Sequence, residues 1–241
     1  MCLIVFAWQV IPGMPLIAAA NRDEFDHRAA LPASWWEDFP EVYAGRDLQG
    51  GGTWMGVTRT GRFAALTNVR APLERRTDVR SRGELVANFL TGTTTPLDYA
   101  AQLREQARDF NGFNLLFGTA DELRWYSNRA LDDARNGHPI TAGIYGLSNA
   151  GFDSPWPKVV RAKAEFASLL CQGASEDAFF EMLTDTRKAS DCRLPKTGIA
   201  IELERELSAV CIDTPGYGTR ASTIVKLDVH RQACLHERTM R

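Results

Sequence analysis

The sequence has few histidines and no cysteine pair of the kind that binds metals. Only four of its 241 residues are histidine. The five cysteines lie far apart and include no C-x-x-C pair, so they indicate neither zinc, iron–sulfur nor dithiol chemistry. They are Cys2, Cys171, Cys192, Cys211 and Cys234. We therefore expect no metal site, and the odd number of cysteines favours a reducing cytoplasm.

A surplus of positive charge is also missing. Lys and Arg together number 28 against 30 Asp and Glu, which gives a net charge of −2. Binding to a phosphate backbone requires a basic surface. We therefore expect no nucleic-acid partner, and no motif in the sequence indicates an oligomeric state.

Long hydrophobic runs are absent as well. The first 21 residues carry no charged side chain, but Gln9 and the Pro12-Gly13 pair divide this stretch into pieces too short to cross a bilayer. The positively charged start of a secretory signal is also missing. We expect no stable membrane insertion. With 44% hydrophobic residues, the chain should fold as a single domain over residues 1–241.

Several short apolar segments have the length and composition of β-strands. Residues 3–8 form a continuous apolar run, which is typical of a strand covered on both faces. The Pro12-Gly13 turn returns the chain through residues 15–20, and the polar residues 21–28 should form a loop. Further strands are expected at residues 53–58, 62–68, 113–120, 122–127, 141–149, 207–213, 217–229 and 232–237.

Helical patterns separate these strands into groups. Ser81 and Glu84 stand at capping-box spacing, which predicts the start of a helix. Further helices are expected over residues 96–110, 155–171 and 175–185. The order of strands, helices, strands, helices and strands lacks the regular alternation of a parallel doubly wound fold. It predicts an α+β domain built on antiparallel sheet.

Cys2 is the first candidate for chemistry. If Met1 is removed, the thiol and the α-amine belong to one residue, so that a nucleophile and its base are adjacent. An α-amine has a pKa of about 7.7 to 8.0 and can therefore accept a proton near neutral pH. The alternative is a small buried side chain in an apolar strand.

Four polar residues near predicted strand ends or turns suit the same chemistry. Asn68 and Asn149 can donate hydrogen bonds to a developing oxyanion. Asp23 can orient the α-amine or the thiol, and the positive charge of Arg220 can lower the pKa of the thiol. Each also has an ordinary structural explanation, because Asn and Asp favour turns and arginines are usually solvated.

Seven short segments occur in an order and at a spacing that are specific when taken together. They are Cys2, Asn21-Arg22-Asp23-Glu24, Gly51-Gly52-Thr53-Trp54, Thr67-Asn68-Val69-Arg70, Ser81-Arg82-Gly83, Asn111-Gly112-Phe113-Asn114-Leu115 and Tyr217-Gly218-Thr219-Arg220. In this set the chain resembles the NRDE family, also called transport and Golgi organisation two, over nearly its whole length. The resemblance implies an Ntn-hydrolase-like fold, a four-layer αββα sandwich of two antiparallel sheets flanked by helices.

Within that superfamily the chain is similar to cysteine enzymes such as choloylglycine hydrolases, penicillin V acylases and acid ceramidase-like amidases. The similarity implies that Cys2 is both nucleophile and base and that Asp23 is its orienting carboxylate. It further implies that Asn68 and Asn149 are oxyanion or substrate-positioning groups and that Arg220 is the late-strand arginine.

The chain departs from those amidases at the second strand. They have an Arg-Asn-x-Asp pattern, whereas this chain reads Ala20-Asn21-Arg22-Asp23. The alignment places Ala20 at the position of the arginine. Arg22 lies two positions further along and shares the same face of a strand. Arg22 is therefore a further candidate site residue.

Two functions remain open. The first is an N-terminal-cysteine amidohydrolase or acyltransferase that acts on a small acyl compound and requires no cofactor. The second is a non-catalytic protein that binds haem, acyl-CoA or lipid in the same pocket. The arginines between residues 70 and 82 can bind an anionic group of a ligand or form a solvated loop. For haem, the sequence contains neither a C-x-x-C-H site nor a pair of histidines with diagnostic spacing.

Overall fold

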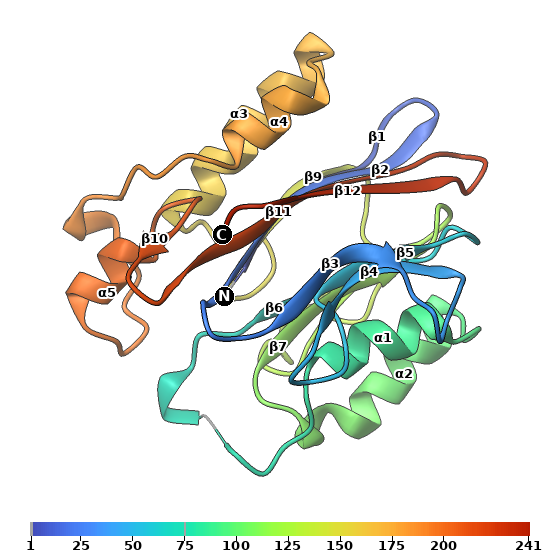
Figure 1. Cartoon of the computed structure of the whole chain (residues 1–241), viewed down its shortest axis with the longest axis horizontal. Coiled ribbons are helices and arrows are strands. Elements are labelled where there is room, and N and C mark those ends of the chain that lie inside the picture. Colours follow the sequence, from blue (N-terminus) through green and yellow to red (C-terminus); the bar gives the residue numbers. More distant parts are fainter. Residues whose placement is uncertain (1, 75) are drawn as a thin grey trace.

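The fold consists of two stacked antiparallel sheets with helices on both outer faces (Figure 1). The computed structural model describes residues 2–74 and 76–241. Four layers follow one another, namely helices, a sheet, a second sheet and helices (Figure 1). The αββα arrangement that the resemblance implies is therefore confirmed.

The first sheet contains the strand that begins with Cys2. Its strands lie in the order β10, β11, β2, β1 and β9, and β12 also pairs with β11. Gly13 lies between β1 and β2 with a φ of 77°, a conformation that glycine adopts without strain, so the expected hairpin forms at the Pro12-Gly13 turn. The strands are β1 (Cys2–Ile11), β2 (Met14–Phe25), β9 (Gly143–Leu147), β10 (Asp213–Thr214), β11 (Tyr217–Leu227) and β12 (Ala233–Thr239).

The second sheet is a meander whose six strands pair in chain order. They are β3 (Ala30–Trp35), β4 (Val42–Asp47), β5 (Met55–Thr58), β6 (Phe63–Asn68), β7 (Phe113–Gly118) and β8 (Leu123–Ser127). Helices α1 (Gly83–Thr91) and α2 (Pro96–Gln106) connect β6 to β7 and cover the outer face (Figure 1). Two short 3-10 helices lie in the same connection, at Pro72–Glu74 and Ala107–Asp109.

Two of the remaining helices cover the outer face of the first sheet (Figure 1). Helix α3 (Pro157–Gln172) packs against β1 and β9. Helices α4 (Glu176–Met182) and α5 (Ile201–Glu206) and a 3-10 helix at Asp191–Arg193 follow it along the chain. No helix in the described part of the chain is both long enough and apolar enough to cross a membrane.

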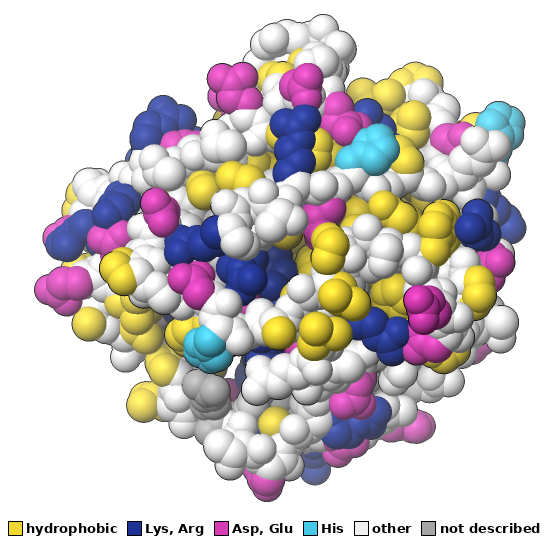
Figure 2. All heavy atoms as spheres, in the orientation of Figure 1, with side chains coloured by type: hydrophobic (Ala, Val, Ile, Leu, Met, Phe, Trp, Pro, Cys, Tyr) yellow, Lys and Arg dark blue, Asp and Glu magenta, His cyan; other side chains and the backbone are white. Residues whose placement is uncertain are grey.

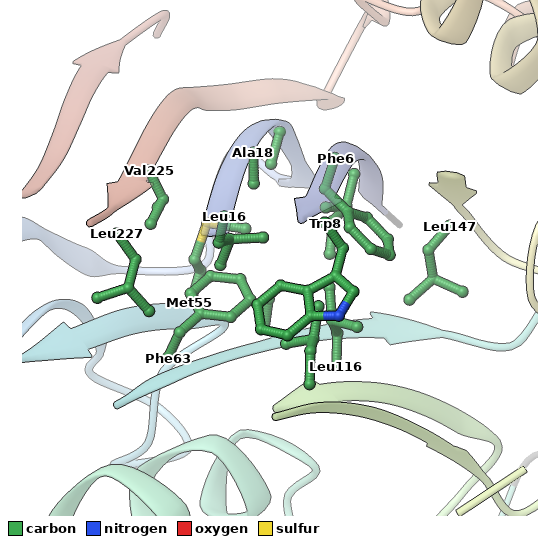
Figure 3. Packing of buried hydrophobic residues seen from close by; sticks show 14 of the residues in the cluster. Phe6, Trp8, Leu16, Ala18, Met55, Phe63, Leu116, Leu147, Val225 and Leu227 are labelled. Atoms are coloured by element: carbon green, nitrogen blue, oxygen red, sulfur yellow. The ribbon is translucent and has the colours of Figure 1, made fainter. Parts of the chain in front are cut away.

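The alternation of side chains along β1 explains why its apolar run is continuous. Ile4, Phe6 and Trp8 point between the two sheets, where Figure 3 shows Phe6 and Trp8 packed above strands of the second sheet. Leu3 and Val5 point the opposite way and pack beneath the helices. Because both faces of β1 are covered, the strand needs no polar face.

The same alternation assigns faces to the polar residues at the end of the hairpin. Cys2 pairs directly with Arg22 across the ladder, so both side chains belong to the face between the sheets. Asn21 and Asp23 belong to the face beneath the helices. The two faces of one strand end therefore carry different polar groups.

Three local predictions differ from the structure. Residues 21–25 continue β2 instead of forming a loop, because β11 pairs with them from the other side. Residues 207–212 form turns instead of a strand, and only Asp213–Thr214 pairs with β11. Helix α1 begins at Gly83 without a side-chain cap from Ser81, although the Ser81 backbone N–H donates to Glu84 Oε1 at 3.2 Å.

Candidate active site

A cavity of about 640 Å³ opens beside the start of β1. Cys2, Arg22, Asp23 and Asn68 are among its lining residues. In Figure 2, Lys and Arg side chains gather near the middle of the visible face, in the part of the view where β1 begins in Figure 1. The structure therefore brings four of the six candidate residues to one cavity.

Cys2 occupies the first position of β1 and is partly exposed. Ser148 Oγ donates to the Cys2 carbonyl oxygen at 3.0 Å, which ties the strand start to the end of β9. Burial raises the pKa of the Cys2 thiol, and the charge of Asp23 acts in the same direction. The charge of Arg22 and the backbone N–H of Asp23 oppose this effect by favouring the thiolate.

Arg22 lies directly opposite Cys2 in the β1–β2 ladder. Its guanidinium carbon is 4.3 Å from the centre of the Trp54 ring, and its Nη2 atom is 4.0 Å from Asp47 Oδ2. Ala20, in contrast, pairs with Ile4 in the apolar core. A cation at position 22 is thus placed across from the thiol, while position 20 lies deeper in the sheet.

Asp23 is buried and is held in place by β11. Its Oδ1 atom accepts a hydrogen bond from Thr219 Oγ1 at 2.7 Å, and Tyr217 donates to its carbonyl oxygen at 3.2 Å. Burial raises the pKa of the Asp23 carboxyl, whereas the charge of Lys158 and the Thr219 hydrogen bond lower it. The carboxyl is therefore fixed in position beside the strand end that carries Cys2.

Asn68 and Asn149 lie next to each other at the ends of β6 and β9. Asn149 Nδ2 donates to the Asn68 carbonyl oxygen at 2.8 Å, and the Asn149 carbonyl oxygen accepts from the Arg70 backbone N–H at 2.8 Å. Only Asn68 is among the described residues that line the cavity. Asn149 thus holds the strand end from which Asn68 faces the cavity.

Arg220 lies apart from this group. It falls at an irregularity in the β2–β11 ladder, between the paired residues Thr219 and Ala221. Its Nη1 atom donates to the carbonyl oxygen of Phe25 at 2.8 Å, and its Nε atom donates to the carbonyl oxygen of Arg241 at 3.2 Å. The guanidinium therefore fastens the chain after β2 and does not line the cavity beside Cys2.

A buried group of charges behind the strand end was not anticipated. Lys158, in the first turn of α3, is only 1% exposed. Nearby, Arg70 and Glu204 form a buried ion pair. The sequence did contain a signal, because Lys158 stands four residues before the buried Ala162 on what is otherwise the apolar side of α3.

Comparison with known proteins identifies the family. The family model described as Transport and Golgi organisation 2 matches residues 1–241. The chain belongs to this family. It is 35% identical to the Transport and Golgi organization protein 2 homologs of Bos taurus and Homo sapiens, with 100% of this chain and 93% of each relative covered. The Drosophila melanogaster protein of the same name is 29% identical, with 100% and 92% covered.

A solved structure supports the fold. The Caenorhabditis elegans ortholog of N-acylethanolamine-hydrolyzing acid amidase superimposes with a TM-score of 0.52 at 10% sequence identity, and 92% of each chain is covered. At this identity the likeness concerns the fold alone. The resemblance to the NRDE family and the Ntn-hydrolase-like fold are both confirmed.

Proposed function

We propose that this member of the Transport and Golgi organisation 2 family is an N-terminal-cysteine amidohydrolase or acyltransferase. Its substrate would be a small acyl compound with an amide C–N bond or a thioester. The observation that carries the proposal is the position of Cys2 at a cavity that Arg22 and Asn68 also line, with Asp23 fixed beside the same strand end. Met1 lies outside the described residues, and its removal remains a prediction.

The chain's own residues supply each step of the proposed reaction. The α-amine of Cys2 takes the thiol proton, and Cys2 Sγ attacks the carbonyl carbon to form a C–S bond while the carbonyl electron pair moves to oxygen. In this proposal the Asn68 side chain donates a hydrogen bond to that oxyanion. The tetrahedral intermediate collapses, the bond to the leaving group breaks, and the leaving group takes the proton from the α-ammonium. Water or another acceptor then releases the acyl group and regenerates the thiol.

The second candidate is a protein that binds an anionic ligand in the same cavity without turnover. Five arginines favour such a ligand, because they line the cavity against three carboxylates. They are Arg22, Arg28, Arg76, Arg80 and Arg82. Acyl-CoA, anionic lipid and haem all carry anionic groups. None of the four histidines, all of them described, is among the lining residues, so a haem bound there would lack a histidine ligand.

Mass spectrometry distinguishes the two candidates. The intact protein is measured before and after brief exposure to a limiting thiol-reactive acyl probe, and the adduct is located by peptide mapping. The enzyme predicts loss of Met1 and labelling confined to Cys2, even though Cys171, Cys192 and Cys234 are exposed. Retention of Met1, or labelling of Cys2 no faster than that of the exposed cysteines, would contradict the proposed enzymatic function. Titration with acyl-CoA and haem would then test the second candidate.

A further inference from the structure

Lys158 is a long cationic side chain that is almost completely buried. It is 1% exposed, and its Nζ atom has no hydrogen-bond partner within residues 2–74 and 76–241. Removing a charged amine from water is unfavourable unless an opposite charge lies nearby. Its neighbours Val159 and Ala162 pack against β1 as ordinary core residues, so packing alone does not require a lysine at this position.

Charged groups from four other segments of the chain act on Lys158. The charges of Asp23 on β2, Cys2 on β1 and Glu204 on α5 favour its protonated form, whereas the charge of Arg70, which follows β6, disfavours it. Tyr217 on β11, which contacts Asp23, has its pKa raised by burial and therefore stays neutral. Arg70 and Glu204 offset each other as an ion pair. Among the charges that act on Lys158 that of Asp23 is the largest, and Lys158 is likewise the largest charge that acts on Asp23.

We propose that Lys158 is the countercharge of Asp23 and, through Asp23, a positioning residue that tunes the nucleophile Cys2. This inference rests on the proposed function. An isolated carboxylate beside the α-amine of Cys2 would stabilise the ammonium form, which cannot accept the thiol proton. A cation on the other side of Asp23 offsets that stabilisation, so that the amine stays available as a base while Asp23 still orients it.

The protonation of Lys158 limits the pH range of this effect. Burial lowers the pKa of Lys158 to about 8. Since a thiolate at Cys2 favours protonated Lys158, protonated Lys158 must equally favour the thiolate. The cation is present below about pH 8 and is lost as the pH rises through that value. Protonated Lys158 therefore favours the Cys2 thiolate at neutral pH, and this effect is lost above about pH 8.

The test measures how fast iodoacetamide alkylates Cys2 as a function of pH, with Cys2 peptides quantified by mass spectrometry. Lys158→Met removes the charge at similar length and should slow the alkylation of Cys2 about tenfold at neutral pH, the equivalent of about one pH unit, but only little above about pH 8, where the wild-type lysine has lost its proton. Lys158→Arg keeps the charge and should stay within about twofold of the wild type by the same relation. The matched control is Lys163→Met, because Lys163 lies on the same helix but is partly exposed and pairs with Asp153.

The outcomes separate this inference from the proposed function. A folded Lys158→Met variant with an unchanged Cys2 profile would show that Lys158 is only structural, even if its melting temperature changes. If Lys158→Met does not fold, recovery of folding in the Asp23→Asn/Lys158→Met double variant supports the pairing of the two charges. Failure to recover overturns it. Retention of Met1 in the wild type defeats the proposed function, whereas the double-variant comparison still reports on the pair.

Discussion

The two ends of the β1–β2 hairpin belong to the same pair of strands but have opposite character. Toward the turn, Phe6 and Trp8 lie in a dry core between the sheets. At the other end, Cys2 and Arg22 face a cavity, and Asp23 and Lys158 are buried charges on the reverse face. The apolar end holds the layers together, whereas the polar end retains groups whose burial is unfavourable. Such a departure from a uniformly apolar core is expected at a functional site.

The largest effect is predicted for the variant that removes the reactive sulfur atom from the polar end. Cys2→Ala should abolish acyl transfer and probe labelling at this position, because Cys2 is the only cysteine among the described residues that line the cavity. Since Cys2 is partly exposed, the free energy of unfolding should change by less than about 1 kcal/mol. Labelling and urea unfolding measure the two quantities. The control is Cys171→Ala, at an exposed cysteine of α3, and an equal loss of activity in that variant would contradict the assignment of Cys2.

The apolar end should show the reverse pattern. Phe6→Ala should lower the free energy of unfolding by about 3 to 5 kcal/mol, because Phe6 is fully buried and packs against Tyr145 and Phe152. The pH profile of Cys2 alkylation should not move while the variant stays folded. Val10→Ala, at an exposed position of the same strand, should cost less than about 1 kcal/mol. A shift in the Cys2 profile of the Phe6 variant would mean that the two ends are coupled.

The buried lysine should make stability depend on pH. Its pKa is about 8 in the folded protein and about 10.4 in the unfolded chain, so between these values the unfolded chain binds more protons. Stability from this group therefore increases as the pH rises through that window, by about 3 kcal/mol in total. Lys158→Met should lack this increase. Urea unfolding of both proteins at about pH 7 and about pH 10 measures the difference, and identical pH dependence in the two would contradict it.

A smaller effect is expected from the hydroxyl that holds Asp23. Thr219 Oγ1 donates to Asp23 Oδ1 and also accepts from the Ile212 backbone N–H at 2.9 Å. Thr219→Val should therefore lower the free energy of unfolding by about 2 kcal/mol, because two buried polar groups lose a partner. Thr219→Ser keeps the hydroxyl and should recover most of the loss. If thermal or urea unfolding shows no loss in Thr219→Val, or a loss in Thr219→Ser as large as that in Thr219→Val, the hydrogen bonds of the hydroxyl do not decide the stability at this position.

Much of the fold followed from local patterns. The apolar run at residues 3–8 predicted a strand buried on both faces, and β1 confirms it. Residues 207–212 were also expected to form a strand but form turns, because their polar backbone groups find other partners. The Val210 carbonyl oxygen accepts from Asn21 Nδ2, and the Ile212 N–H donates to the Thr219 hydroxyl. Such side-chain partners replace a strand ladder and cannot be inferred from the apolar pattern.

The candidate site was predictable only in part, because some of its contacts also depend on distant parts of the chain. Cys2 and Asp23 stood out by type and position, and Arg22 by its shared strand face with Ala20. The position of Arg220, whose guanidinium binds carbonyl oxygens after β2, depended on an irregularity in the ladder. Lys158 was missed because its place on the apolar side of α3 indicates only burial, and the charged groups that act on it come from distant parts of the chain.

By itself, the sequence determined the order of strands and helices, the hairpin that begins with Cys2, and the residue types able to carry acyl chemistry, because these depend on neighbours a few positions apart. Only the tertiary structure decided which groups meet. Asp23 and Lys158 are 135 positions apart in the sequence, and both are buried only in the folded molecule, where α3 packs onto the first sheet. Electrostatic coupling depends on distance and burial, which are properties of the folded molecule.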